Sequence, residues 1–239
     1  MVRHIPNLLT LGNAFCGCVG IVQLLQGHWQ LTALFVGIAL VFDFADGFVA
    51  RALRVHSELG KQLDSLSDAI TFGVLPAFIA FIFLIRATHL PNDLLQGDLQ
   101  AVVWWHYSAF LIAVCSVLRL ARFNIDTRQS DTFIGVPTPA NAILWTSLLI
   151  IVQQQPFYQT WLYNLYVLIP LIFLMSFLLV AELPLFSLKF KNFTWKDNQI
   201  KYIFLILSLL LVLLLKYLAL PLMIVLYIAI SVIHNIIKK

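Results

Sequence analysis

The chain has 239 residues, of which 61% are hydrophobic and only 11% are charged, with a net charge of +4. A soluble domain carries about 25% charged residues and about 45–50% apolar ones, so a water-soluble globular enzyme is excluded. Intrinsic disorder is excluded too, because it requires low hydrophobicity and high charge. The apolar runs are long and unbroken, unlike the alternating strands of a transmembrane barrel. The composition therefore predicts an all-α fold, a polytopic bundle of transmembrane helices.

Apolar runs along the chain predict about eight membrane spans, since one span needs about 20 apolar residues. These runs cover residues 8–26, 30–50, 67–87, 103–121, 138–154, 161–182, 200–216 and 218–236. Only Lys216 and Pro221 interrupt the last two runs, so we interpret them as a short C-terminal transmembrane hairpin.

Lys and Arg residues are distributed unevenly between the two sides of these spans. Of the 15 basic residues, Arg86 and Lys216 fall on one side and all the others fall on the opposite side. Because basic residues concentrate in cytoplasmic loops, both termini are predicted to lie in the cytoplasm, which agrees with an even number of spans. We therefore expect a multi-pass protein of the inner cell membrane with no nucleic-acid partner.

Acidic residues cluster at the predicted cytoplasmic ends of spans two and three. Four of the 11 acidic residues fall within 26 positions, namely Asp43, Asp46, Asp64 and Asp68. Their i, i+3 and i, i+4 spacings place each pair on one helix face, and the short connection 52–59 makes the two helices antiparallel neighbours. Four carboxylates in a poorly solvated place repel one another unless a cation holds them together. The alternative is that they only decorate water-facing helix ends.

Oxygen ligands of this kind indicate a site for Mg²⁺, Mn²⁺ or Ca²⁺ rather than for zinc. Two such ions held by four aspartates would clamp the phosphate in an in-line phosphoryl transfer. The small residues Gly47, Ala50 and Gly60 leave room beside the carboxylates for a large ligand. The guanidinium of Arg51 can pair with a phosphate. Close helix packing through small residues is the competing explanation for the two glycines.

Residues 43–68 read D-x2-D-G-x2-A-R-x8-G-x3-D-x3-D. This pattern resembles the sequence signature of the CDP-alcohol phosphatidyltransferase family at every fixed position. The resemblance implies an integral membrane enzyme that transfers a phosphatidyl group from CDP-diacylglycerol to an alcohol and releases CMP. It also implies one or two Mg²⁺ or Mn²⁺ ions bound by Asp43, Asp46, Asp64 and Asp68, with Ca²⁺ as another ion that the site can hold. Asp68 would act as the general base.

Three further segments resemble the bacterial phosphatidylserine synthase branch of this family. They are residues 5–10 (IPNLLT), 119–124 (RLARFN) and 133–140 (FIGVPTPA). The resemblance implies L-serine as the acceptor, a homodimer, and a catalytic membrane domain over residues 1–190. It leaves residues 191–239, the C-terminal hairpin, to packing.

The resemblance also implies a set of residues that bind CDP-diacylglycerol. They are Asn7, Thr10, Gly47, Ala50, Arg51, Ser57 and Gly60. Helix capping alone would equally explain Asn7.

Two arginines at the inner end of span four are candidates for binding the acceptor. Arg119 and Arg122 are three residues apart, and either can bind the carboxylate of serine, while Asn124 and Asp126 are candidates for its ammonium group. The alternative for both arginines is anchoring at the cytoplasmic surface with snorkelling side chains.

Other functions are also compatible with an acidic cluster in a membrane protein. A divalent-cation transporter would place its carboxylates near the middle of the bilayer, whereas these lie at helix ends beside Arg51. A non-catalytic lipid-binding scaffold would not need four aspartates. Within the transferase hypothesis, the other acceptors are glycerol 3-phosphate, inositol phosphate and choline, and a phosphorylated acceptor calls for more basic residues than Arg119 and Arg122.

Overall fold

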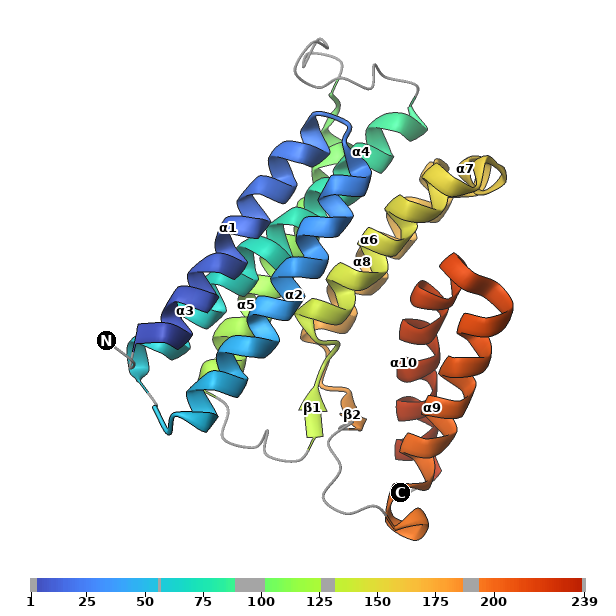
Figure 1. Cartoon of the computed structure of the whole chain (residues 1–239). Helices are drawn as coiled ribbons and strands as arrows, with labels where there is room; N and C mark the ends of the chain where they lie inside the picture. The colour runs from blue at the N-terminus through green and yellow to red at the C-terminus, as the bar shows by residue number, and fades with distance from the viewer. Residues whose placement is uncertain (1–3, 56, 89–101, 126–131, 187–193, 238–239) are drawn as a thin grey trace.

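The computed structural model describes residues 4–55, 57–88, 102–125, 132–186 and 194–237, and it consists almost entirely of helices (Figure 1). The helices are α1 (Ile5–Leu25), α2 (Trp29–Ala52), α3 (Glu58–Asp68), α4 (Leu75–Ala87), α5 (Leu111–Ile125), α6 (Thr138–Gln154), α7 (Gln159–Leu162), α8 (Leu165–Val180), α9 (Trp195–Leu215) and α10 (Ala219–Ile237). A π-helical segment, Ala69–Val74, joins α3 to α4, and 3₁₀ turns cover Trp104–Phe110, Pro156–Tyr158 and Lys216–Leu218.

The central element of the bundle is one continuous helix of 30 residues, formed by α3, the π-helical segment and α4. It begins with a polar stretch, and after Asp68 it becomes apolar on every side. Ten of the 13 residues of α4 are buried, because α1, α6 and α8 pack around it together with the 3₁₀ turn before α5. A helix that is apolar all round is typically buried in this way. The polar start of the same helix is thereby fixed in position at one end of the bundle.

The outer helices expose large apolar side chains. On α1 and α2 these include Phe15 and Phe44, and on α9 they include Leu209, Leu213 and Leu214. A water-soluble protein would rarely leave so much apolar surface uncovered. The lipid bilayer is the solvent that suits these faces.

Five helical stretches of the described residues are long and apolar enough to cross a membrane: Ile5–Leu25, Trp29–Ala52, Glu58–Ala87, Trp104–Ile125 and Asn198–Asn235. The pair Pro156–Leu162 and Leu165–Val180, bent by 72°, adds a sixth. This is fewer than the eight spans expected from the sequence. Two features account for the difference, since α6 has only 17 residues and α9 and α10 lie within one 38-residue stretch.

A short pair of strands departs from the expected all-α fold. β1 (Thr132–Ile134) pairs antiparallel with β2 (Pro184–Phe186), with Phe133 opposite Leu185. Gly135, which follows β1, has a φ of 72°, and a Cβ there would lie 2.7 Å from the carbonyl oxygen of Leu179. Only glycine fits this turn without strain. The pair therefore fixes the start of α6 against the end of α8.

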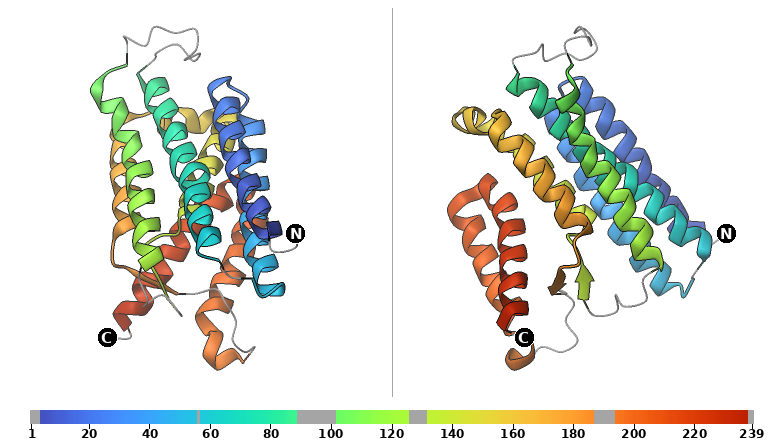
Figure 2. Two further views of the ribbon diagram at one scale, coloured as in Figure 1. Left: turned by 90° about the vertical axis from the view of Figure 1, so that its left-hand side faces the viewer. Right: turned by 180° about the vertical axis from the view of Figure 1, so that it is seen from behind.

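The C-terminal hairpin expected from the sequence is present. α9 and α10 are connected by the turn Lys216–Leu218, and α10 contacts α6 and β2. The side-chain amide of Asn235 donates a hydrogen bond to the carbonyl of Pro184. The predicted domain boundary at residues 190 and 191 lies outside the described residues. The start of α1 and the end of α10 lie at the same end of the molecule in both views of Figure 2.

Candidate active site

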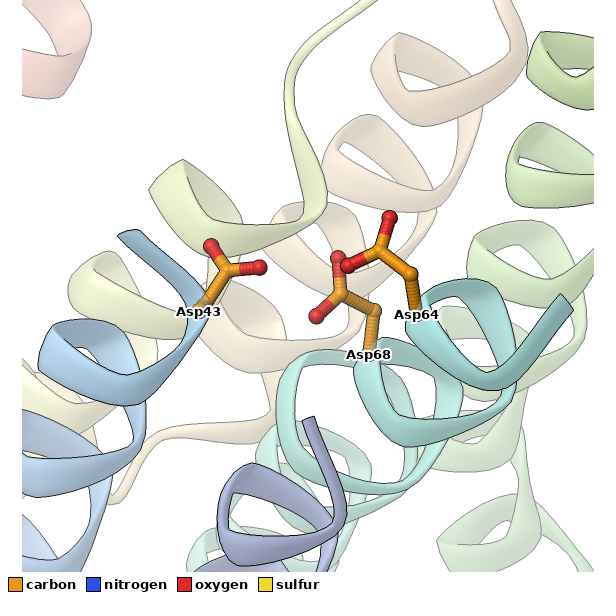
Figure 3. Close-up of side chains that lie close together, drawn as sticks. All are labelled: Asp43, Asp64 and Asp68. Carbon is orange, nitrogen blue, oxygen red and sulfur yellow. The ribbon is translucent and has the colours of Figure 1, made fainter. Parts of the chain in front are cut away.

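Three carboxylates converge between α2 and α3, two helices that both pack against α1. Oxygen atoms of Asp43, Asp64 and Asp68 all lie within 4.8 Å of one another, and Figure 3 shows the three side chains directed toward a common point. Asp43 lies nine residues before the end of α2, and Asp64 and Asp68 lie one turn apart on α3. The convergence predicted from their spacing is therefore present for these three residues.

The fourth predicted ligand, Asp46, is buried and is held by α1. The hydroxyl of Thr10 lies 2.5 Å from Oδ2 of Asp46 and 3.0 Å from the carbonyl oxygen of Pro6. A hydroxyl has one proton to donate, and a carboxylate is the stronger acceptor. Thr10 therefore orients Asp46, which lies beside the group of three rather than within it.

A buried amide that the sequence analysis did not single out contacts the deepest carboxylate. Asn13 is fully buried on α1, and its Nδ2 donates a hydrogen bond of 3.0 Å to Oδ1 of Asp68. The hydroxyl of Thr71 donates to the backbone carbonyl of Asn13 at 3.0 Å. A Cβ on Gly17 would lie 2.2 Å from that hydroxyl, so glycine is needed where α1 approaches the central helix. Asn13 follows Thr10 by three residues, and this helical spacing is the signal that could have identified it.

The π-helical segment begins directly after Asp68. Such wide turns are rare and occur frequently at functional sites. Within it, Thr71 faces α1 as described, and Gly73 faces α5, where an added Cβ would lie 3.0 Å from Cβ of Ser116. The two neighbouring helices therefore hold the wide turn from both sides.

A cavity of about 580 Å³ lies beside the carboxylates, a volume within the usual range of about 300–1,000 Å³ for ligand pockets. It is lined by Pro6, Asn7, Thr10, Asp43, Asp46, Gly47, Ala50, Val55, Ser57, Glu58, Gly60, Lys61 and Asp64. Six of the seven residues predicted to bind CDP-diacylglycerol are in this set, and Arg51 is the exception. Asp68 does not line the cavity, because it lies deeper along the central helix.

The predicted nucleotide contacts at the start of α3 have specific local roles. Ser57 caps α3, because its hydroxyl accepts a hydrogen bond of 2.9 Å from the backbone N–H of Gly60. Asn7 does not cap α1, whose N-cap is His4, so the capping explanation for Asn7 is wrong. A Cβ on Gly60 would lie 3.2 Å from Oδ1 of Asn7, so helix packing does explain this glycine. Ser57 and Glu58 line the cavity, so the N-terminus of α3, which is the positive end of the helix dipole, faces it.

Arg51 lies over Gly47, the first glycine of the pattern. A Cβ on Gly47 would lie 3.4 Å from a terminal nitrogen of Arg51. The guanidinium is exposed at the end of α2 and lies next to a residue of the cavity wall. This places Arg51 next to the cavity, and its contact with a ligand there stays a prediction.

Four further residues of the cavity wall, Pro6, Val55, Glu58 and Lys61, were not predicted as ligand contacts. In the sequence, Lys61 is one of the 13 basic residues on the predicted cytoplasmic side. Its Nζ donates a hydrogen bond of 2.5 Å to the backbone carbonyl of Asn124, which joins α3 to the end of α5. Its position directly after Gly60, a fixed residue of the family pattern, is the signal that could have identified Lys61.

The candidate acceptor residues have different environments. Arg119 is 8% exposed, its Nε has no hydrogen-bond partner among the described residues, and its charge interacts with that of Asp68. Arg122 is exposed and donates a hydrogen bond of 3.3 Å to the carbonyl of Val180 at the end of α8. Asn124 donates a hydrogen bond of 2.8 Å to the hydroxyl of Ser65, and Asp126 lies outside the described residues.

The donor set of the three converging aspartates fits a divalent cation with a preference for oxygen. Three carboxylates this close repel one another strongly at low dielectric, and no basic side chain contacts any of them at ion-pair distance within the described part of the chain. Mg²⁺ is commonly bound by a few carboxylates together with phosphate oxygens of a substrate. The adjoining cavity has room for such a substrate.

Comparisons with known proteins agree with this geometry. A family model described as CDP-alcohol phosphatidyltransferase matches residues 3–174, which include all four aspartates. The chain is 36% identical over 138 residues to the CDP-diacylglycerol–serine O-phosphatidyltransferase of Bacillus subtilis (strain 168), a match that covers 58% of this chain and 71% of that protein.

Two other relatives match a similar stretch. The archaetidylserine synthase of Methanothermobacter thermautotrophicus is 33% identical over 146 residues, or 60% of this chain and 56% of that protein. A CDP-diacylglycerol–serine O-phosphatidyltransferase of Helicobacter pylori (strain 26695) is 36% identical over 141 residues, or 58% of this chain and 54% of that protein. The chain thus spans little more than half the length of these two relatives. The family resemblance seen in the sequence pattern is confirmed, and the chain belongs to the CDP-alcohol phosphatidyltransferase family.

Proposed function

We propose that this protein transfers the phosphatidyl group of CDP-diacylglycerol to L-serine, which forms phosphatidylserine and releases CMP. The observation that carries the proposal is the convergence of Asp43, Asp64 and Asp68 beside a cavity lined by residues of the family pattern. The related proteins from bacteria and from an archaeon are named for different lipids, yet serine occurs in the names of all of them. This supports serine over glycerol 3-phosphate, inositol phosphate or choline.

The cavity wall suits the cytidine diphosphate part of the donor. The N-terminus of α3 and the side chains of Arg51 and Lys61 present positive charge to a diphosphate. A bound divalent cation, Mg²⁺ or Mn²⁺, would neutralise the diphosphate and stabilise negative charge that develops on the phosphorus. Leu8 and Phe48 directly follow the cavity residues Asn7 and Gly47 in the sequence, and their apolar side chains are exposed. The acyl chains of the donor can therefore extend from the cavity into the bilayer.

The proposed reaction is a single displacement at the phosphorus that carries the diacylglycerol. The hydroxyl oxygen of serine forms the new P–O bond, and the bond to the phosphate of CMP breaks. Asp68 accepts the proton of the hydroxyl, and CMP leaves with the electron pair of the broken bond. Asn13 holds Asp68 in position through the hydrogen bond to Oδ1, which leaves its second oxygen for the acceptor.

Arg119 is the better candidate of the two arginines for binding the serine carboxylate. It is buried, its charge interacts with Asp68, and its Nε lacks a partner among the described residues. Arg122 instead contacts the end of α8. Because Asp68 lies deeper than the cavity lining, the acceptor would meet the donor from the side of Arg119.

We further propose eight spans with both termini and the active site on the cytoplasmic side of the inner membrane. The start of α1 and the end of α10 lie at one end of the bundle (Figure 2). This placement, the α9–α10 hairpin and the uneven distribution of basic residues along the sequence support the proposal. We also propose a catalytic domain over residues 1–190 and a homodimer, both on the basis of the family resemblance. The mass of the protein in native mass spectrometry would test the dimer.

The experiment that tests the function uses the full-length protein purified in detergent with Mg²⁺ and radiolabelled CDP-diacylglycerol. L-Serine, glycerol 3-phosphate, inositol phosphate and choline are supplied separately, and the release of CMP and the labelled lipid are followed. We expect phosphatidylserine from serine alone. Transfer to another alcohol would contradict the acceptor, and retention of the label in CDP-diacylglycerol with every alcohol would contradict the reaction class.

A further inference from the structure

A lysine of the cavity wall is held across the interface between α3 and α5. Lys61 lines the cavity, and its Nζ donates a hydrogen bond of 2.5 Å to the backbone carbonyl of Asn124, in the last turn of α5. The last carbonyls of a helix have no partner within the helix, and a positive charge beside them is favourable. Capping of α5 therefore explains the bond, but it gives no reason for the lysine to come from the cavity wall.

Two further hydrogen bonds close a ring between the two helices. The side-chain amide of Asn124 donates a hydrogen bond of 2.8 Å to the hydroxyl of Ser65, and that hydroxyl donates to the backbone carbonyl of Lys61 at 3.3 Å. With the bond from Nζ, these three residues form what we call the α3–α5 ring. A hydroxyl can donate one proton and accept at the same oxygen, so every bond of the ring is chemically consistent. Asn124 thus contacts α3 through both its carbonyl and its side chain.

The α3–α5 ring fixes a turn of α3 that belongs to the site. Lys61 and Asp64 both line the cavity, and Ser65 directly follows Asp64, one of the three converging carboxylates. Further along the same interface, a Cβ on Gly73 would lie 3.0 Å from Cβ of Ser116 on α5. This close contact lies about two turns from the ring on each helix. The two points together define the register of α5 on the central helix.

An ordered ammonium group in the cavity wall favours an anionic ligand. A lysine side chain that is free in solution loses rotamer freedom when it binds a ligand, and that loss lowers the affinity. Nζ of Lys61 is already ordered by the carbonyl of Asn124, and this bond uses one of the three donors of an ammonium group. The N-terminus of α3 faces the same cavity and also favours an anion. A phosphate group is the anion that both features suit.

We propose that Asn124 is a positioning residue for the donor: through the α3–α5 ring it holds the ammonium group of Lys61 where that group binds a phosphate of the cytidine diphosphate. The sequence makes Asn124 a candidate for binding the ammonium group of serine, whereas the ring assigns its side chain to α3. This inference rests on the proposed function, since it takes CDP-diacylglycerol as the ligand of the cavity.

The direct test measures the Kd of the full-length protein in detergent for CDP with Mg²⁺, by isothermal titration calorimetry. Lys61→Gln removes a charged hydrogen-bond donor, so we expect the Kd to rise by about tenfold. Asn124→Ala keeps the backbone carbonyl but releases it from Ser65, and the loss of one neutral hydrogen bond should raise the Kd by about threefold. An unchanged Kd in Asn124→Ala would overturn the proposal.

Asn235→Ala is the matched control for this measurement. The side-chain amide of Asn235 also donates to a backbone carbonyl of another element, that of Pro184, but neither residue lines the cavity. The variant therefore loses a bond of the same kind at a different place. We expect its Kd for CDP to equal that of the wild type, and a rise equal to that in Asn124→Ala would overturn the assignment to the ring.

A double-mutant cycle separates positioning from general packing. Ser65→Ala should raise the Kd as much as Asn124→Ala, and the double variant should bind CDP no more weakly than either single variant, because both changes remove the same hydrogen bond. Additive effects would overturn the inference. In transfer assays of these variants, the KM for CDP-diacylglycerol should rise and the KM for serine should stay within about twofold. A rise in the KM for serine alone would return Asn124 to the acceptor.

These measurements distinguish failure of the inference from failure of the proposed function. Binding of CDP needs no acceptor, so the result holds whichever alcohol the protein uses. A wild type that binds CDP with the same affinity as Asn124→Ala overturns only the inference. A wild type that binds no CDP overturns the proposed function and the inference together.

Discussion

Replacing Asp68 by Asn tests the general base of the proposed reaction. Asparagine has nearly the same shape, and its amide oxygen can accept the hydrogen bond from Asn13. The change removes one of three negative charges within 4.8 Å of one another, and each pair at such a distance costs on the order of 3 kcal/mol at an effective dielectric of about 20. The metal-free variant should therefore fold at least as well as the wild type.

The same change should slow transfer strongly, since serine keeps a neutral hydroxyl at neutral pH and needs a base within hydrogen-bond reach. General-base catalysis contributes about 10²–10⁴-fold, so we expect kcat to fall by ~10²-fold or more, equivalent to about 2.7 kcal/mol in activation free energy. The assay is transfer to serine at saturating Mg²⁺, with binding of CDP-diacylglycerol measured separately and expected to persist. Weak hydrolysis of the donor without serine can also persist.

Two results would refute this reasoning. A kcat within a few-fold of the wild type would remove Asp68 as the base, because no other change in the variant compensates for a lost proton acceptor. Loss of CDP-diacylglycerol binding equal to the loss of kcat would assign Asp68 to donor binding instead. Glu182→Gln is the control, since Glu182 is an exposed carboxylate just after α8, and it should leave both quantities unchanged.

Chelation by excess EDTA should abolish transfer, and Mg²⁺ or Mn²⁺ should restore it. Added Mg²⁺ should also raise the melting temperature of the wild type. Full activity in excess EDTA would exclude a metal ion from the reaction. Asp43→Asn and Asp46→Asn should each lose that Mg²⁺-dependent shift together with binding of CDP-diacylglycerol, and tight donor binding in both would contradict their role. Arg119→Lys should raise the KM for serine by about tenfold or more, because lysine keeps the charge without the planar fork. Arg122→Lys should have little effect, and equal kinetics of both variants and the wild type would leave only the anchoring role.

The sequence predicted those parts of the site that depend on local spacing. Helical periodicity places Asp64 and Asp68 on one face of α3. The short connection between α2 and α3 predicts that this face lies opposite Asp43. Six of the seven expected donor-binding residues line the cavity for the same reason. Apolar runs alone did not determine the number of spans, since α6 is short and the last two runs are nearly continuous.

Features that depend on contacts distant in the sequence were not predicted. Asn13 is a polar residue in an apolar helix, and only the packing of α1 on the central helix shows that it meets Asp68. The strand pair joins residues about 50 positions apart, with no alternating pattern long enough to indicate strands. Arg119 and Arg122 look equivalent in the sequence, and the packing of α5 against α8 decides that one is buried and the other exposed.

The π-helical segment Ala69–Val74 sets the rotational phase between the two halves of the central helix. A π turn is equivalent to one residue inserted into an α-helix, which rotates everything on one side of it by about 100° relative to the other. Since α4 is fixed by burial in the core, that rotation is expressed in α3. A chain with one residue fewer in this segment would keep its apolar core, but Asp64 and Asp68 would turn away from Asp43. The direction in which the two carboxylates point is thus set by the length of a segment that contains no charged residue.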